Sequence, residues 1–302
     1  MAYSTISIDW EDFGQQYGKY HFGKLTEPVN GSIERQTKIM LDLLDETNTK
    51  ATFFILGHLA SYRTNLVKDI AARGHEIGLH SQNHEPMFNL SLKQAREDVA
   101  TSQKIVTDII GKAVYGFRAP YFSIKKDNLW LLEILADLGL TYDSSIFPVE
   151  LPRYGIANFS PKDCLYKLPS GKEIIELPMT TATFMKRAWP VSGGGYIRLM
   201  PKLLIKKVFE NFEKSKTDSM IYMHPYEFDS QKIEVASNYP DGAKYSKFKI
   251  GALNLKWNMF RPSVTGKIRT LLRSHQFITC LQKAEIIKKN NTAIPLQLHQ
   301  YQ

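Results

Sequence analysis

Two histidines in the stretch HEIGLHSQNH, residues 75–84, have a spacing that suits metal binding. His80 and His84 are four positions apart, so on a helical turn their imidazoles would lie on one face and could meet at one point. Imidazole nitrogens are common ligands of divalent transition metals. The pair is a weak signal by itself, because two histidines at this spacing are more often ordinary surface residues. The metal-site hypothesis therefore depends on which other reactive side chains fold beside them.

The elements that would position these side chains are predicted from hydrophobic periodicity. Apolar runs predict strands at residues 3–8, 51–56, 75–80, 114–117, 140–142 and 220–224. Helical patterns lie between them, at residues 33–47, 66–73, 91–111, 129–138 and 201–214. Ser91 and Gln94 form a capping box at the start of the third of these helices. Strands alternating with helices predict a parallel sheet, either open or closed into a barrel.

Reactive side chains fall at the carboxyl ends of five predicted strands. They are Asp9, Glu11 and Asp12 after the first strand, His80 and His84 after the third, Arg118 and Asp143 after the next two, and His224 after the last. Ligands and catalytic groups collect at this edge of parallel sheets and barrels. Turn-forming polar residues are common at strand ends. Reactive side chains after five different strands nevertheless favour a catalytic or metal-binding site.

The middle and end of the chain have a weaker pattern. Residues 147–200 are rich in proline and glycine and predict loops with one hairpin, residues 164–168 with 173–177. One further amphipathic helix is predicted near residues 264–273. Cys164 and Cys280 lie far apart without a CxxC pattern, so the sequence indicates neither a disulfide framework nor a thiolate metal site.

Five ordered motifs give the chain a family resemblance. They are SIDWED (7–12), HEIGLHSQNH (75–84), RAPYF (118–122), YDSSIFP (142–148) and YMHPYEFD (222–229). In this order the sequence resembles the polysaccharide deacetylases, the NodB-homology carbohydrate esterases. ELP (176–178) and GGGYIR (193–198) further resemble the subgroup found with exosortase and exopolysaccharide gene clusters. The resemblance implies a distorted (β/α) barrel over residues 1–230, with residues 231–302 as a basic extension packed on it.

The resemblance also implies a metal-dependent N-deacetylase acting on an acetamido sugar. Its metal would be one divalent ion, zinc first, with cobalt, nickel or iron as alternatives. His80 and His84 would be ligands, completed by a carboxylate from the first motif. This ligand set leaves an open coordination position for water.

The remaining motif residues receive catalytic roles from the same resemblance. Asp9 would be the general base, and Arg118 would pair with Asp9 and orient it. His224 would be the general acid, with Asp143 fixing its orientation. The backbone N–H of Tyr121 would stabilise the oxyanion. Three aromatic residues are predicted to contact the sugar: Tyr121, Trp189 and Tyr226.

The first motif departs from the family pattern in the residue that completes the metal site. Most members have two adjacent aspartates followed by glycine, whereas here Asp9 is followed by Trp10, Glu11 and Asp12. If the strand continues, Glu11 points the same way as Asp9; if the chain turns after Trp10, Asp12 takes the place. The shorter carboxylate loses less rotamer freedom, which favours Asp12, with Glu11 as the alternative.

The charge distribution predicts the kind of partner, and an N-terminal sequence unlike a secretory signal peptide predicts the location. The net charge of +9 arises in residues 201–302, and Lys244 to Lys289 holds eleven basic residues and one acidic residue, Glu285. Such a segment favours an anionic partner: a lipid-diphosphate-linked or nucleotide-linked sugar, or an anionic membrane. A nucleic-acid partner is not expected, because no recognition motif is present. We expect a cytoplasmic protein, peripheral to the inner membrane.

Three functions fit the residues. The first is N-deacetylation within the biosynthesis of a surface polysaccharide or glycolipid. The second is hydrolysis of another non-peptide C–N bond, and the third is a catalytically inactive sugar-binding module on the same barrel. The first is favoured because all five motifs keep their reactive side chains.

Overall fold

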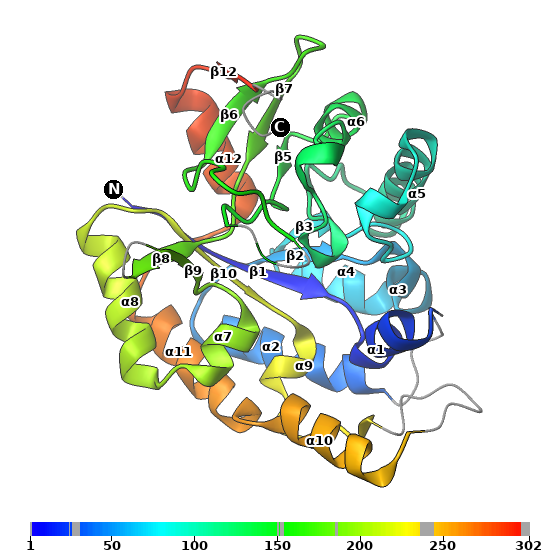
Figure 1. The fold of residues 1–302 in the computed structure, drawn as a ribbon, viewed down its shortest axis with the longest axis vertical. Helices are drawn as coiled ribbons and strands as arrows, with labels where there is room; N and C mark the ends of the chain where they lie inside the picture. Colours follow the sequence, from blue (N-terminus) through cyan, green and yellow to red (C-terminus); the bar gives the residue numbers. More distant parts are fainter. Residues whose placement is uncertain are drawn as a thin grey trace.

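The centre of the molecule is a sheet of short parallel strands that follow one another in sequence (Figure 1). The computed structural model describes residues 2–23, 25, 31–149, 151, 154–184, 187–235 and 245–296. The first five strands pair in chain order, which is the arrangement that alternating strands and helices predict. They are β1 (Ser4–Trp10), β2 (Thr52–Ile55), β3 (Glu76–Leu79), β4 (Gly116–Phe117) and β5 (Tyr142–Asp143).

Later strands extend both ends of this sheet. On one side β10 (Ser219–Met223) returns to pair in parallel with β1. On the other side β5 pairs with β7 (Glu173–Glu176), which forms the predicted hairpin with β6 (Cys164–Lys167). A separate hairpin joins β8 (Thr181–Phe184) to β9 (Arg187–Pro190). The result is a distorted (β/α) barrel, as predicted.

Helices cover the outer face of the sheet, and local signals set several of their ends. They are α1 (Phe13–Phe22), α2 (Ser32–Glu46), α3 (Gly57–Tyr62), α4 (Thr64–Ala72), α5 (Leu92–Ile110), α6 (Leu131–Asp137), α7 (Gly194–Leu199), α8 (Lys202–Lys214), α9 (Pro225–Phe228), α10 (Lys247–Asn258), α11 (Val264–Ser274) and α12 (Cys280–Asn290). Helix α5 has the predicted Ser91–Gln94 capping box and ends at Gly111, whose φ of 68° suits glycine.

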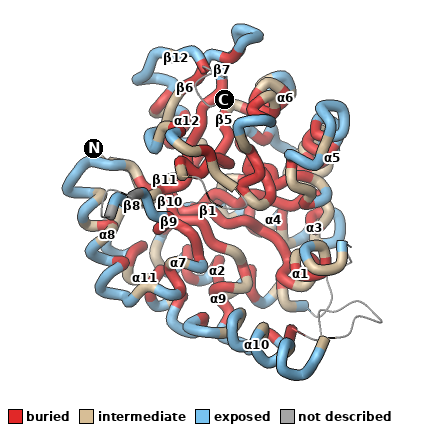
Figure 2. The backbone as a smooth tube through the Cα atoms, viewed as in Figure 1, coloured by how far each residue is buried: buried red, intermediate tan, exposed pale blue. Residues whose placement is uncertain are grey.

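The core lies between the strands and these helices, and Figure 2 shows the centre of the sheet buried, whereas β12 at its edge is exposed. Strand β1 illustrates the pattern, because every residue from Thr5 to Trp10 is buried. Its apolar residues Ile6, Ile8 and Trp10 alternate with the polar residues Thr5, Ser7 and Asp9, so one face of the strand packs in the core and the other carries buried polar groups. Each fully buried Ile, Leu or Phe side chain contributes about 1.5–3 kcal/mol to folding.

The C-terminal part of the chain contributes to the same sheet. Strand β11 (Phe277–Ile278) pairs with β1, and β12 (Ile294–Pro295) pairs with β6. Helix α12 is anchored between them, because the buried Glu76 carboxylate accepts a hydrogen bond from Leu281 N (2.8 Å). The division of the chain at residue 230 stays a prediction, and the sheet continues across it.

No helix in the described part of the chain is long and apolar enough to span a membrane.

Candidate active site

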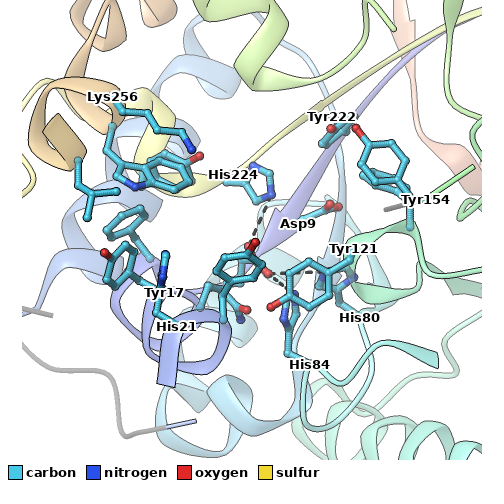
Figure 3. Close-up of a pocket in the computed structure, with 18 residues that line it drawn as sticks. Asp9, Tyr17, His21, His80, His84, Tyr121, Tyr154, Tyr222, His224 and Lys256 are labelled. Carbon is cyan, nitrogen blue, oxygen red and sulfur yellow. Dashed lines mark ion pairs between the residues drawn. The ribbon is translucent and has the colours of Figure 1, made fainter. Parts of the chain in front are cut away.

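A pocket of about 490 Å³ opens at the carboxyl ends of β1, β3 and β10 (Figure 3). It brings together reactive side chains that are more than 200 positions apart in the sequence. Seven of the predicted site residues line it: Asp9, Glu11, His80, His84, Tyr121, His224 and Tyr226. This is the edge of a parallel sheet at which ligands are expected to bind.

The two histidines reach the pocket through a tight turn after β3. Ser81 and His84 both have positive φ (65° and 51°), and His84 N donates to Ser81 Oγ (3.0 Å). The buried Asp98 carboxylate accepts the backbone N–H groups of Gln82 (2.8 Å) and Asn83 (3.1 Å), which holds the turn in place. A non-helical turn therefore brings the two imidazoles together, in place of the helical turn that the four-residue spacing predicted.

Each imidazole presents Nε2 to the same carboxylate. His80 Nδ1 donates to the Arg118 carbonyl (2.8 Å), so its Nε2 is the nitrogen available to a ligand. Glu11 Oε2 lies 3.6 Å from His80 Nε2 and 2.7 Å from His84 Nε2. Burial alone would raise the pKa of Glu11, but the imidazoles of His84, His80 and His224 outweigh it, so this pKa lies well below its usual range. Burial lowers the pKa of His84.

The structure corrects the preference for Asp12 as the third ligand. Asp12 is the N-cap of α1: its Oδ1 accepts from Gln15 N (3.0 Å) and its Oδ2 accepts from Ser32 Oγ (3.0 Å). A carboxylate that caps a helix in this way is turned away from the histidines. The alternative, Glu11, occupies the place beside His80 and His84.

Asp9 and Arg118 form the predicted pair. Arg118 Nη1 donates to Asp9 Oδ1 (2.7 Å), and both side chains are buried. The guanidinium is held by further bonds to Ser7 Oγ (2.8 Å) and to the carbonyl of Ser144 (2.9 Å), and it lies 4.2 Å from the Phe54 ring centre. Five fixed donors in one plane make arginine suited to this position.

His224 is oriented by Glu227, which is a correction to the prediction that Asp143 does so. Glu227 Oε2 accepts from His224 N (2.9 Å) and lies 3.3 Å from His224 Nδ1, and the His224 Nε2 atom lies 3.5 Å from Glu11 Oε1. Burial alone would lower the pKa of His224, but Glu227, Glu11 and Asp9 together raise it to about 9. A raised pKa favours the protonated imidazole, which is the form that a general acid requires.

Asp143 instead supports the loop that follows β4. Its Oδ1 accepts from Ser145 Oγ (2.6 Å), and Ser145 Oγ in turn accepts from Ala119 N (2.7 Å). Asp143 is also next to Glu176, and burial raises the pKa of both carboxyl groups, most strongly that of Glu176. A shared proton between two buried carboxylates explains why the pair is tolerated.

The structure brings two of the three predicted aromatic residues to the pocket. Tyr121 and Tyr226 line the pocket, and Tyr121 has a φ of 55° that places its ring 4.6 Å from that of His84. Trp189 lies on β9 with 53% of its side chain exposed and is not among the residues that line the pocket. The structure therefore places Trp189 on a hairpin that the sequence did not predict and outside the lining of this pocket, and its contact with the sugar stays a prediction.

Several pocket residues were not predicted from the sequence. Helix α1 supplies Tyr17, Tyr20 and His21, and α10 supplies Lys256 and Trp257. His21 lies in the last turn of α1. Its position four residues after Tyr17, whose ring lies 4.2 Å away, is the local signal that could have placed both on one helix face. His75 is buried at the other end of β3.

The donor set fits a divalent metal ion. The nearest ligand atoms of Glu11, His80 and His84 lie within 4.8 Å of one another, and all three residues are buried. Two imidazoles and one carboxylate are a ligand set of catalytic zinc sites and leave a position for water. Among the described residues no other group of this kind is found.

Two family models match the chain. Residues 29–142 match the model described as polysaccharide deacetylase, and residues 144–284 match the model described as Domain of unknown function (DUF3473). The first match contains His80, His84 and Arg118, and the second contains His224 and Glu227.

Three of the curated relatives that the chain is similar to are described as deacetylases. The peptidoglycan deacetylase of Helicobacter pylori is 26% identical over 82% of this chain and 78% of its own length. The peptidoglycan-N-acetylglucosamine deacetylase of Bacillus cereus is 36% identical over 32% of this chain and 36% of its own length. Chitin deacetylase 1 of Cryptococcus neoformans is 29% identical over 35% of this chain and only 22% of its own length.

A solved structure shows the same fold over nearly the whole chain. It belongs to a Mycobacterium smegmatis protein described as a candidate polysaccharide deacetylase and has a TM-score of 0.64 at 17% identity. It covers 98% of this chain and 95% of its own. With the match over residues 29–142, the relatives described as deacetylases and the barrel in agreement, the chain belongs to the polysaccharide deacetylase family.

Proposed function

We propose that the protein is a metal-dependent N-deacetylase that hydrolyses the acetamide group of an N-acetylated sugar. One observation carries the proposal: three metal-ligand side chains, a buried Asp–Arg pair and a His–Glu pair meet in a single pocket. The relatives described as peptidoglycan and chitin deacetylases support this reaction class.

The reaction adds water across the amide, so that the C–N bond breaks and acetate and a free amine form. Asp9 accepts a proton from the attacking water, and Arg118 holds the carboxylate in place for this transfer. His224 donates a proton to the departing amine nitrogen, and Glu227 keeps its ring oriented. Tyr121 contributes its backbone N–H at the acetyl oxygen.

Glu11, His80 and His84 are the residues that would hold the metal. When bound there, a divalent ion supplies an acidified water and a positive charge beside the acetyl oxygen. Histidine and carboxylate ligands suit zinc, and also cobalt, nickel and iron. We propose zinc, because the ligand set matches that of zinc hydrolases.

The pocket walls support a sugar substrate that carries an anionic group. Tyr121 and Tyr226 offer aromatic faces on which a sugar ring can stack. Lys256 brings a positive charge to the same pocket (Figure 3), which suits the phosphate of a lipid-linked or nucleotide-linked sugar. We propose that the enzyme acts within the biosynthesis of a surface polysaccharide or glycolipid; the cytoplasmic location and the exosortase subgroup stay predictions.

Several cations of the basic segment from Lys244 to Lys289 are engaged within the fold and are not available to a partner. Lys244 lies outside the described residues. Five of the other cations are bound within the fold: Arg261, Lys267, Arg269, Arg273 and Lys283. Lys283, for example, is buried and lies 2.7 Å from Asp163. Contact with an anionic surface therefore depends on the lysines that remain exposed.

Acetate release tests the proposal directly. A panel of chitooligosaccharides, a nucleotide-linked N-acetylglucosamine and a lipid-diphosphate-linked N-acetylglucosamine is offered to the wild type, with and without a chelator. We expect acetate from at least one substrate, loss of release with the chelator, recovery on adding zinc, and a loss of about 100-fold or more in Asp9→Asn.

The other two functions give different results in this experiment. An inactive sugar-binding module binds the panel without releasing acetate. A hydrolase of another C–N bond is inactive on the whole panel but keeps its metal. Acetate release that ignores both the chelator and the Asp9→Asn substitution would overturn the mechanism.

A further inference from the structure

Helix α10 forms one wall of the pocket and is fixed there by its inner face. Leu253 and Trp257 line the pocket. Asn254 Oδ1 accepts from Val235 N (2.8 Å), and Asn258 Oδ1 accepts from Ile233 N (2.8 Å). The orientation of the helix is therefore set by its contacts with the barrel, and its opposite face is turned outward.

The outward face of α10 is an apolar stripe. Phe248, Ala252, Leu255 and Met259, here called the α10 stripe, have the spacing i, i+4, i+7 and i+11, which places them on one side of a helix and its last turn. Phe248 is 87% exposed, Leu255 68% and Met259 38%. No residue of α10 is buried, and Figure 2 shows the helix largely exposed along its length.

Lysines flank this stripe, and the helix itself carries no carboxylate. Lys247, Lys249 and Lys256 lie on α10, and residues 245–258 contain no acidic residue. Within the part of the chain that the structure describes, none of the three forms an ion pair, and Lys249 Nζ instead lies 3.6 Å from the Tyr245 ring centre. The helix therefore presents apolar side chains bordered by unneutralised positive charge.

This combination fits an anionic lipid surface. Helices that lie in a bilayer interface have an apolar face bordered by lysine or arginine, and they bind through buried apolar area and attraction to anionic headgroups. A face that only water contacts gives no reason for a phenylalanine that is 87% exposed. A purely electrostatic partner would use the lysines and leave the stripe uncovered.

We propose that the α10 stripe inserts into the interface of an anionic bilayer. Since the inner face of the same helix lines the pocket, docking places the pocket beside the membrane surface. The substrate class that matches this placement is an acetamido sugar carried on a lipid phosphate, with Lys256 at the level of the headgroups. The substrate part of this inference rests on the proposed deacetylase function, whereas the docking part does not.

Vesicle sedimentation of the full chain tests the docking. The probes are phosphatidylcholine vesicles with and without phosphatidylglycerol, at low salt, where charge attraction is least screened. The stripe variant is Phe248→Ser with Leu255→Ser, and the matched control is Leu92→Ser, which changes a leucine 57% exposed on α5. Circular dichroism and acetate release from a soluble substrate check that each variant folds, because neither stripe residue lines the pocket.

The expected result is binding of the wild type and of Leu92→Ser to the phosphatidylglycerol vesicles, with affinity at least about tenfold lower in the stripe variant. Three results overturn the proposal: no binding by the wild type, equal binding by the stripe variant, or a wild-type dimer that the stripe variant converts to a monomer in light scattering. Vesicle binding without any acetate release would leave the docking intact and refute the proposed function alone.

Discussion

The buried pair of Asp9 and Arg118 allows a quantitative test of how the site is built. The perturbation is Arg118→Met, which keeps a long side chain but removes the cation 2.7 Å from the Asp9 carboxylate. The same substitution removes the donors to Ser7 Oγ and to Ser144 O. Because Asp9 is only 2% exposed, water can replace only a small part of these contacts in the folded protein.

Arg118→Met lowers the free energy of unfolding because the Asp9 carboxylate is left buried without a positive partner. Breaking a buried ion pair by removing one partner costs about 3–5 kcal/mol of unfolding free energy. That is a large fraction of the 5–15 kcal/mol that stabilises a typical domain. In an Asp9→Asn background the remaining partner is neutral, so we expect Arg118→Met to cost about 2–3 kcal/mol less there.

Urea unfolding of the wild type, both single variants and the double variant measures this coupling. A cycle that closes additively, within about 0.5 kcal/mol, would refute the reasoning, because the two charges would then stabilise the fold independently. Equal denaturant slopes across the four proteins serve as the control that the unfolded states are alike.

Two further predictions concern Gly194, which lies against Glu227 of the site, and His75, which lies at the other end of β3. A Cβ at Gly194 would overlap the Glu227 carboxylate, whereas one at Gly195 meets nothing within 4 Å. Gly194→Ala is therefore expected to lower the unfolding free energy by about 1–3 kcal/mol and to reduce acetate release by displacing Glu227, while Gly195→Ala does neither; equal effects in calorimetry and in the assay would contradict this. Burial lowers the pKa of His75 from 6.5 to about 4. The folded state then binds this proton more weakly than the unfolded state, so the stabilisation is complete above about pH 6.5 and is lost as the pH falls toward 4. Between about pH 7 and pH 5 the wild type should lose about 1–2 kcal/mol more than His75→Gln in urea titrations, and parallel losses would show that His75 is not the cause.

Local signals predicted much of the barrel. The Ser91–Gln94 capping box and Gly111 gave the bounds of α5, because caps act within a few residues of a helix end. The hairpin of β6 and β7 was predicted for the same reason, since its turn residues lie between the two strands. The parallel sheet followed from the alternation of these elements.

Long-range pairings could not be predicted in the same way. Strand β11 has two residues, Phe277 and Ile278, and pairs with the first strand of the chain. Two residues carry no detectable period, and their pairing depends on contacts formed only after the chain has folded. The position of Trp189 was not predicted for a different reason. It lies on the β8–β9 hairpin, and the sequence between these two strands has no distinct turn signal.

The two corrections at the site have different origins. Asp12 was preferred as a ligand on side-chain entropy, but its position as the N-cap of α1 mattered more, and an aspartate directly before a helix was a local signal for this. Glu227 was overlooked although it lies three residues after His224 in the same motif. Asp143 lies at the end of a strand, as predicted. Its partners Ser145 and Glu176 could not be predicted, because the contact with Glu176 forms only when the chain folds.

Metal binding by wild type, Glu11→Gln and Asp12→Asn is the most direct test of the central claim. Calorimetric titration of zinc into the chelator-treated wild type should show one site. Asp12→Asn should bind like the wild type, because asparagine also caps a helix. Glu11→Gln should bind at least about 100-fold more weakly, a loss at or above that found for outer partners of metal ligands. Unchanged zinc binding in Glu11→Gln together with loss of binding in Asp12→Asn would contradict the site described by Glu11, His80 and His84.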